Sequence, residues 1–210
     1  MSLPRVLIVD DHRAVAEGLV QILSDQFEVV ATIADGRLVL EAISRLHPGI
    51  VLLDVSMPSV NGLEVLRQLR QRAPGVRVVV LTMHADASLA VEALRTGACG
   101  YVLKSGGEEL LTALQVVLAG DIYLARELRA KITTLMAGAA DPRQIALTPQ
   151  QQEVLQLIVL GRRAREISGI LGVPTGGVET IKRDLMQLLN VQSTAELVQY
   201  AIDHRLVTSP

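Results

Sequence analysis

Through its first 120 residues the chain alternates short, unbroken apolar runs with segments whose apolar residues recur at helical spacing. The runs Val-Leu-Ile-Val, Ile-Val-Leu-Leu and Val-Val-Val-Leu are continuous, as expected for strands that helices cover on both faces. The alternation therefore predicts a doubly wound parallel α/β sheet, with its ligand site at the carboxyl ends of the strands. The expected strands are Arg5–Val9, Glu28–Thr32, Ile50–Leu53, Arg77–Leu81 and Gly100–Leu103.

Helical patterns lie between these runs. They are Val15/Leu19/Ile22/Leu23, Val39/Ile43/Leu46 and Leu110/Leu111/Leu114/Val117/Leu118. After Gly120 the strand signals fade, and the stretch 125–146 reads as a short helix followed by a linker. We expect three parts: a first domain over 1–124, this linker, and a second domain over 147–210.

From Leu147 onward only helical patterns remain, and four short helices are expected. Thr148 can cap the first helix, which Pro149 opens and Gly161 ends. The second should end at Gly172. Thr175 is expected to cap the third, whose inward stripe is Val178, Ile181, Leu185 and Leu188, and the fourth should begin near Ser193. The middle pair, joined by Gly172-Val173-Pro174, matches a helix-turn-helix unit.

Composition limits where such a chain can work. No uncharged apolar run approaches the roughly 20 residues that cross a bilayer, and the start of the chain does not resemble a signal peptide. The single cysteine, Cys99, excludes an internal disulfide and is interpreted as a small buried residue near a strand, with a reactive thiol as the alternative. We expect a cytoplasmic protein that does not act at a membrane.

Charge is unevenly distributed. Residues 1–124 carry 10 basic and 14 acidic side chains, whereas residues 147–210 carry 6 of each. The first domain is therefore unsuited to nucleic acid. Because the second domain is neutral overall, any DNA-binding surface on it must be a local basic patch.

Carboxylates follow two of the strands. Asp10 and Asp11 come after the first strand and Asp54 after the third, so the predicted topology brings them together. Three converging carboxylates repel one another unless a cation is bound, and oxygen-only ligands favour Mg²⁺. Thr82 and Lys104 end the fourth and fifth strands and add a hydroxyl and an ammonium. Three carboxylates, a hydroxyl and an ammonium at one edge are typical of a site that binds and transfers phosphoryl groups. His12 and His84 flank it, but Mg²⁺ prefers oxygen, so they are not expected to be ligands.

The segments Val-Asp-Asp-His, Leu-Leu-Asp-Val-Ser-Met-Pro, Leu-Thr and Gly-Tyr-Val-Leu-Lys resemble the receiver domains of two-component signalling over roughly residues 4–120. The resemblance implies a flavodoxin-like five-stranded sheet of order 2-1-3-4-5. It makes Asp54 the phosphoacceptor for a sensor histidine kinase, with Lys104 and Thr82 binding phosphoryl oxygens. Mg²⁺ would be held by Asp10, Asp11, Asp54 and the backbone carbonyl of Ser56.

The same resemblance implies a switch. Tyr101 would turn inward as Thr82 moves toward the phosphoryl group, which shifts a population toward the active state. An aromatic residue on a last strand is also often simply core, and that alternative stays open. No enzyme activity is expected beyond slow, self-catalysed phosphoryl transfer and dephosphorylation at Asp54.

The second domain resembles the LuxR-type, or NarL/FixJ, DNA-binding domain over about residues 145–205. The segments that carry this resemblance are Leu147-Thr-Pro-Gln-Gln-Gln-Glu-Val-Leu through Gly161, Glu166-Ile, Leu171-Gly-Val and Val178-Glu-Thr-Ile-Lys-Arg. The outward side chains of its recognition helix, expected at base edges, are Glu179, Thr180, Arg183 and Gln187. A basic patch, expected at DNA phosphates, comprises Arg162, Arg163, Arg165 and Lys182.

The second domain departs from the usual family pattern at Gly177, Glu179 and Ile181, and Gln150 to Gln152 replace a usually charged run. Gly176-Gly177 predicts a loose first turn of the recognition helix.

These features lead to one reading and two alternatives. We expect a regulator that binds double-stranded promoter DNA and forms a homodimer when phosphorylated, through the receiver or through Leu197, Val198 and Ala201 of the last helix. Phosphorylation would also free a recognition helix that the receiver covers. One alternative is a protein-interaction module with impaired DNA binding. The other is a phosphatase-like enzyme, which usually carries a second aspartate where this chain has Ser56.

Overall fold

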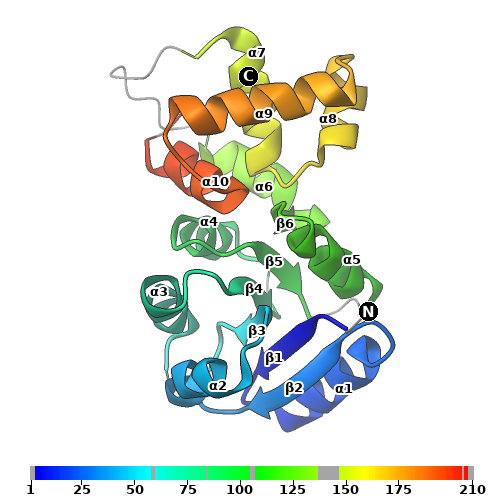
Figure 1. Ribbon diagram of the computed structural model, residues 1–210, viewed down its shortest axis with the longest axis vertical. Helices are drawn as coiled ribbons and strands as arrows, with labels where there is room; N and C mark the ends of the chain where they lie inside the picture. The colour runs from blue at the N-terminus through cyan, green and yellow to red at the C-terminus, as the bar shows by residue number, and fades with distance from the viewer. Residues whose placement is uncertain are drawn as a thin grey trace.

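The structure is a computed structural model that describes residues 3–57, 60–83, 85–104, 107–136, 147–204 and 206–207. Its first part is an α/β unit, its last part is a group of short helices, and the helix α6 (Arg126–Met136) lies between the two (Figure 1). This helix confirms the short helix expected after Gly120. The linker expected over the rest of 125–146 lies, from residue 137 on, outside the described residues.

In the described part of the chain the sheet has six strands in the order β2-β1-β3-β4-β5-β6, and every neighbouring pair is parallel. The five expected strands and their order are confirmed. The sixth was missed because two residues are too few to show a periodic pattern. The strands are β1 (Arg5–Val9), β2 (Glu28–Ile33), β3 (Ile50–Asp54), β4 (Arg77–Thr82), β5 (Gly100–Leu103) and β6 (Tyr123–Leu124).

Helices cover both faces of the sheet. On one face α1 (Arg13–Leu23) and α5 (Gly107–Leu118) pack on residues such as Val6 and Ile8 of β1. On the other face the intervening strand residues Leu7 and Val9 pack against helices that include α6. That face carries α2 (Val39–Leu46) with its preceding turn η1 (Gly36–Leu38), α3 (Gly62–Arg72) and α4 (Ala87–Arg95). Ile22, expected in the inward stripe of α1, is instead 39% exposed.

The described residues from 147 onward form four helices, which are α7 (Pro149–Val159), α8 (Ala164–Leu171), α9 (Thr175–Leu188) and α10 (Thr194–Asp203). The expected cap at Thr148 and the expected start near Ser193 are confirmed, and each of these side chains accepts a hydrogen bond from a backbone N–H of the first turn. Gly161 and Gly172 have the left-handed φ values of 69° and 66° that let the chain leave α7 and α8.

Two details of α9 differ from expectation. Thr175 is the first residue of the helix rather than its cap, because Pro174 already holds the N-cap position. Val178 and Leu185 are buried as expected, but Leu188 is 51% exposed. Gly176 and Gly177 lie within the first turn, so that turn does form in this sequence.

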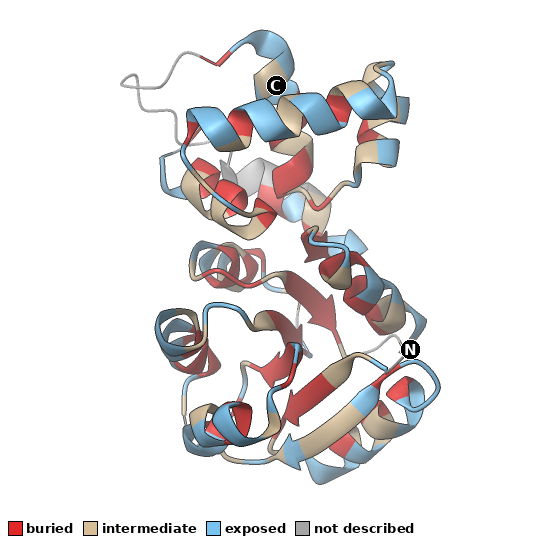
Figure 2. Cartoon of the chain, in the orientation of Figure 1, coloured by how far each residue is buried: buried red, intermediate tan, exposed pale blue. Residues whose placement is uncertain are grey.

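The helical part packs against the β6 edge of the sheet. A Cβ on Gly161 would stand 2.9 Å from the backbone nitrogen of Leu124, so the end of α7 touches the open edge of β6. Leu94 of α4 and Ile122 belong to the same buried cluster as the cores of α7, α9 and α10. Figure 2 shows buried segments on both sides of this junction. The helical part thus protects a sheet edge that would otherwise be open to pairing with another chain.

Arg129 of α6 connects the two parts. Its Nε donates a hydrogen bond of 3.1 Å to the carbonyl of Leu124, and its Nη1 lies 3.8 Å from Oε1 of Glu166 on α8. Its guanidinium also lies over the ring of Tyr123, at 5.9 Å from the ring centre. The linker helix is therefore tied to β6 and to the helical part by the same side chain.

Candidate functional site

The acidic site forms where β1 and β3 end side by side. β1 leads directly into Asp10 and Asp11, and Asp54 is the last residue of β3. One ligand atom from each of these carboxylates and from His12 lies within 4.8 Å of the others. The structure therefore brings together the three carboxylates that the sequence predicts.

Asp54 is completely buried and both of its carboxylate oxygens have partners. Oδ1 accepts a hydrogen bond of 2.9 Å from the backbone N–H of Ser56, and Oδ2 lies 2.7 Å from the Nζ of Lys104. The Lys104 side chain, 4% exposed, also places Nζ 2.7 Å from Oδ2 of Asp10. A single ammonium therefore neutralises part of the charge of two buried carboxylates.

The donor set suits a hard divalent cation. Asp10 Oδ2 and Asp11 Oδ1 are buried and accept no hydrogen bond from the described residues, although Lys104 and His12 are close to them. Buried carboxylate oxygens with free lone pairs are what Mg²⁺ binds. Lys104 alone cannot balance three carboxylates, so the site also retains negative charge for a cation.

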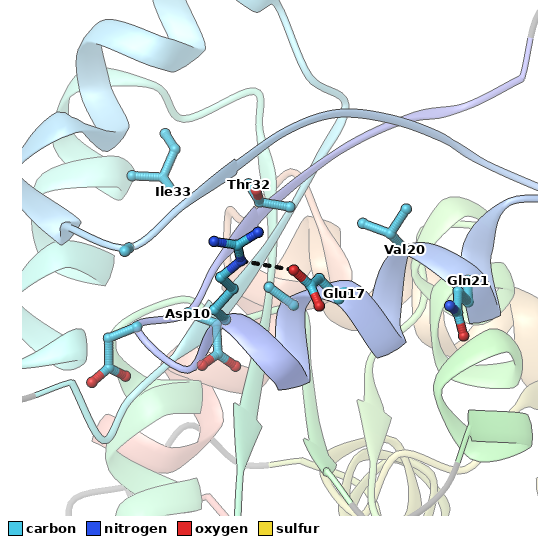
Figure 3. Close-up of a pocket in the computed structure, with 10 residues that line it drawn as sticks. Asp10, Glu17, Val20, Gln21, Thr32 and Ile33 are labelled. Carbon is cyan, nitrogen blue, oxygen red and sulfur yellow. Dashed lines mark hydrogen bonds and ion pairs between the residues drawn. The ribbon is translucent and has the colours of Figure 1, made fainter.

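An open cavity of about 660 Å³ adjoins the acidic site, between α1 and β2. Figure 3 shows Asp10 at one end of it and Thr32 and Ile33 on the β2 side. Its α1 side carries an ion pair of 2.7 Å between Arg13 and Glu17, which the sequence analysis did not single out. This cavity gives a second molecule access to Asp10 and Asp11.

Thr82 is the last residue of β4 and Tyr101 is the second residue of β5, and both are buried. Burial raises the pKa of Tyr101 to about 12, and the nearby Thr82 side chain opposes part of that rise. Tyr101 packs in the cluster that contains Leu128 of α6. Its ring is thus already buried in this structure, in a cluster to which the linker helix also contributes.

The remaining candidates from the sequence are His12, His84 and Cys99. His12 is 64% exposed and its Nδ1 lies 3.0 Å from Oδ1 of Asp11, whereas His84 lies outside the described residues. Burial raises the pKa of the Cys99 thiol, which disfavours the reactive thiolate. Cys99 lies just before β5, next to the sheet, as a small core residue would.

The face of α9 expected to meet DNA bases points into solvent. Figure 2 shows long exposed stretches on this helix. The hydroxyl of Thr180 donates to the carbonyl of Gly176 at 3.0 Å. The exposed residues of this face are Glu179, Thr180, Arg183 and Gln187. The receiver part does not cover them in this structure.

The basic patch divides into two pairs. Arg163 and Arg165 are exposed, as phosphate contacts require. Arg162 instead pairs with Glu166 at 3.0 Å, and the Nζ of Lys182 lies 2.7 Å from Oδ1 of Asp121. Asp121 lies just before β6 and was not predicted from the sequence, because an isolated acidic residue after Gly120 gives no local signal of this contact.

The last helix is covered. Leu197, Val198 and Ala201 are fully buried, because α10 packs on α4 as well as on α7 and α9. The Nη2 of Arg95 on α4 donates to the carbonyl of Ile202 at 3.4 Å, and its Nε lies 3.6 Å from Asp203. The apolar surface expected to pair two copies is therefore inaccessible in this arrangement.

Two family models match the chain. Residues 6–115 match the response regulator receiver domain, and residues 145–201 match the bacterial regulatory proteins of the luxR family. Together they span most of the chain and both ends of the structure described above. No described helix has the length and apolar character that a membrane crossing requires.

Individual relatives agree with these models. The transcriptional regulatory protein MctR of Rhizobium johnstonii is 33% identical over 207 residues, which cover 97% of this chain and 95% of MctR. A LuxR-family two-component response regulator from Aurantimonas sp. SI85-9A1 is 32% identical with a TM-score of 0.61, over 64% of this chain and 98% of that one. The RcsB response regulator of Salmonella typhimurium is 25% identical with a TM-score of 0.61, over 95% and 98% of the two chains.

These relatives are regulators rather than conventional enzymes, and they do not favour the protein-interaction alternative. The receiver sheet with its buried aspartate, the helix-turn-helix unit, and the matches over both lead to one conclusion. The chain belongs to the two-component response regulators that join a receiver domain to a LuxR-type DNA-binding domain and act as transcriptional regulators.

Proposed function

We propose that Asp54 accepts a phosphoryl group from a phosphohistidine of a sensor histidine kinase, and that this event controls promoter binding by the helical domain. The observation that carries the proposal is the complete burial of Asp54 between the backbone N–H of Ser56 and the ammonium of Lys104. A buried carboxylate held by two oriented donors is prepared for one reaction rather than for contact with solvent.

The proposed transfer is a displacement at phosphorus. An oxygen of Asp54 forms the new O–P bond as the N–P bond of the phosphohistidine breaks, and the released imidazole takes a proton from solvent. Lys104, already 2.7 Å from Asp54, binds an oxygen of the arriving group as a point charge. Thr82, at the end of the neighbouring strand, supplies a hydroxyl to another oxygen. Water later hydrolyses the acyl phosphate slowly at the same place.

Mg²⁺ is the proposed cofactor. Asp10, Asp11 and Asp54 would hold it with the backbone carbonyl of Ser56, and it would neutralise negative charge on the phosphoryl oxygens. The support is the convergence of three carboxylates whose negative charge the single Lys104 ammonium does not balance.

The switch is proposed to run through β5. Tyr101 shares a buried cluster with Leu128 of α6, so a change at Thr82 that alters the packing of Tyr101 would also alter the support of the linker helix. The DNA contacts are proposed at the exposed face of α9 and at Arg162, Arg163, Arg165 and Lys182. Two of these four, Arg162 and Lys182, need release from Glu166 and Asp121 first.

The proposed working state is a homodimer on two half-sites of double-stranded promoter DNA, about one helical turn apart. Because α10 is buried against α4, dimerisation through Leu197, Val198 and Ala201 requires the two domains to separate. We also propose the division into 1–124, 125–146 and 147–210, and a location in the cytoplasm, where promoter DNA is found.

The test is phosphorylation of the full chain with a small acyl phosphate and Mg²⁺, with intact mass as the readout. Asp54→Asn should abolish the gain of one phosphoryl group, whereas Asp86→Asn, which removes an N-cap acid near the site, should retain it. Beryllofluoride should raise the affinity of the wild-type chain for DNA and leave Asp54→Asn unchanged. Normal labelling of Asp54→Asn would refute the assignment.

A further inference from the structure

Lys182 lies on the flank of the recognition helix that faces the receiver. At about 100° per residue it stands roughly a third of a turn away from the middle of the exposed face of α9. Its Nζ lies 2.7 Å from Oδ1 of Asp121, and the two side chains are only 17% and 30% exposed. The ammonium is therefore directed at the receiver, while the neighbouring side chain of Arg183 is free in solvent.

The position of Asp121 is fixed by the receiver fold. Gly120 turns the chain with a φ of 90°, and the backbone N–H of Asp121 donates to the carbonyl of Val116 at 3.2 Å. Two residues later β6 begins, and the backbone N–H of Ala125, just after it, donates to the carbonyl of Tyr101 at 2.9 Å. Asp121 thus lies just before the edge strand that pairs with β5, the strand of the proposed switch residue.

Packing differs on the two sides of the ion pair. On one side Ile122 meets the core of the helical domain around Val178, and the cavity there measures only about 10 Å³, at the lower limit of what a water needs. On the other side Asp121 borders a cavity of about 230 Å³, lined by both domains. The apolar packing around Ile122 orients the ammonium of Lys182. The larger cavity lets water reach Lys182 and Asp121 when the two side chains separate.

A phosphate of DNA and the carboxylate of Asp121 compete for Lys182. Both are anions, and bringing both onto one ammonium would place two like charges within a few ångströms of each other. The docked domain also screens Lys182 from an approaching duplex. While the Asp121 contact holds, Lys182 contributes no free positive charge to the DNA-binding surface.

We propose that Asp121 is an autoinhibitory residue that withholds Lys182 from DNA in the docked arrangement. The proposal rests on the proposed function, because it takes Lys182 as a phosphate contact. Release of the ion pair adds one cation to the DNA surface at the moment the domains separate. By linkage, bound DNA favours domain separation to the same extent that separation favours DNA binding.

The test compares two full-length, unphosphorylated variants that change net charge equally. Asp121→Asn removes the carboxylate that holds Lys182. Asp25→Asn removes an exposed carboxylate beside β2, at the opposite edge of the sheet from β6. Fluorescence anisotropy with a mixed-sequence duplex of about 30 base pairs, long enough for two half-sites, measures affinity over a salt series.

Asp121→Asn should bind DNA about 3- to 10-fold more tightly than Asp25→Asn, the range expected for release of one partly exposed ion pair. Its affinity should also fall more steeply with salt, by about 0.9 in the log–log slope, because one more phosphate is neutralised. In a Lys182→Gln background the advantage of Asp121→Asn should disappear.

Three outcomes overturn the proposal, and they are distinguishable. If beryllofluoride strengthens DNA binding by the wild-type chain but Asp121→Asn behaves as Asp25→Asn, only the role of Asp121 fails. If the wild-type chain binds no DNA with or without beryllofluoride, the proposed function fails and the autoinhibitory role fails with it. A gain by Asp121→Asn that persists in the Lys182→Gln background would also refute the pairing.

Discussion

Gly62, the first residue of α3, lies directly against the main chain of Asp54. A Cβ at position 62 would stand 2.6 Å from the carbonyl oxygen of Asp54 and 2.5 Å from the Cα of Val55. The loop after β3 therefore folds back onto the aspartate, and only glycine permits that approach. The close contact restrains the segment whose Ser56 N–H donates to Asp54.

Gly62→Ala should displace this segment. We expect a loss of about 1–3 kcal/mol in the free energy of unfolding, typical of an overpacked site, and slower phosphorylation because the Ser56 donor moves. Urea unfolding and the rate of labelling by an acyl phosphate measure the two effects. Gly18→Ala is the matched control, because a Cβ there meets nothing within 4 Å and a helical alanine should stabilise by up to about 1 kcal/mol. Equal behaviour of the two variants would contradict the importance of the contact.

Lys104→Met should make the fold depend on a divalent cation. Without the ammonium, the buried carboxylates of Asp10 and Asp54 have lost their shared cation, and breaking a buried pair costs about 3–5 kcal/mol. Added Mg²⁺ should raise the midpoint temperature of unfolding more in Lys104→Met than in the wild-type chain, because a bound cation replaces the lost charge. Thermal unfolding across a MgCl₂ series provides the comparison. No difference in Mg²⁺ response between the two chains would show that Lys104 and the cation act independently.

Much of this fold could be predicted because its signals are local. The continuous apolar runs located Arg5–Val9 and Gly100–Leu103 without error, and the other three expected strands proved one residue longer. The glycines that end α7 and α8 and the cap Thr148 could also be predicted, since each acts on its own turn of the chain. The acidic site followed from topology, because parallel strands end at one edge.

The rest depends on how the two domains dock, which leaves no local pattern. Lys182 finds its partner 61 residues away at Asp121, and that contact gives a partner in the receiver to a residue predicted to contact DNA phosphates. The burial of Leu197 and Val198 has two sources, the helical core and α4, and only the first is visible in helical periodicity. β6 is two residues long and owes its existence to pairing with β5.

Tyr101 should make the protein sensitive to alkaline pH. Its pKa is raised to about 12 in the folded state, above the usual value of about 10, so the folded state retains the phenolic proton that the unfolded state loses. The stability from burying neutral Tyr101 is complete below pH about 10 and is lost as the pH rises toward 12. Tyr101→Phe should flatten this decline in urea unfolding experiments between pH 9 and about 11.

Tyr123 gives the comparison for that experiment, because burial and Glu109 raise its pKa to about 12 as well. Tyr123→Phe should remove the part of the alkaline loss of stability that Tyr123 causes and leave the part that Tyr101 causes. The double variant should therefore lose the least stability as the pH rises. Tyrosinate absorbance should show one late-ionising phenol fewer in each single variant. A decline unchanged in Tyr101→Phe would mean that Tyr101 ionises as an exposed tyrosine does, contrary to its burial.

Alanine variants of Gly161 and Gly172 distinguish an effect on domain docking from the effect of backbone strain at a helix end. Both have a left-handed φ, 69° and 66°, so alanine at either position costs about 1–2 kcal/mol in backbone strain. A Cβ on Gly161 would also stand 2.9 Å from the backbone nitrogen of Leu124, whereas one on Gly172 meets nothing within 4 Å.

Both alanine variants should weaken the helical domain similarly, but only Gly161→Ala should push that domain off the β6 edge. The radius of gyration from small-angle X-ray scattering should therefore grow for Gly161→Ala and stay at the wild-type value for Gly172→Ala. Equal radii in all three chains would show that β6 tolerates the added methyl group and that contact with Gly161 does not hold the domains together.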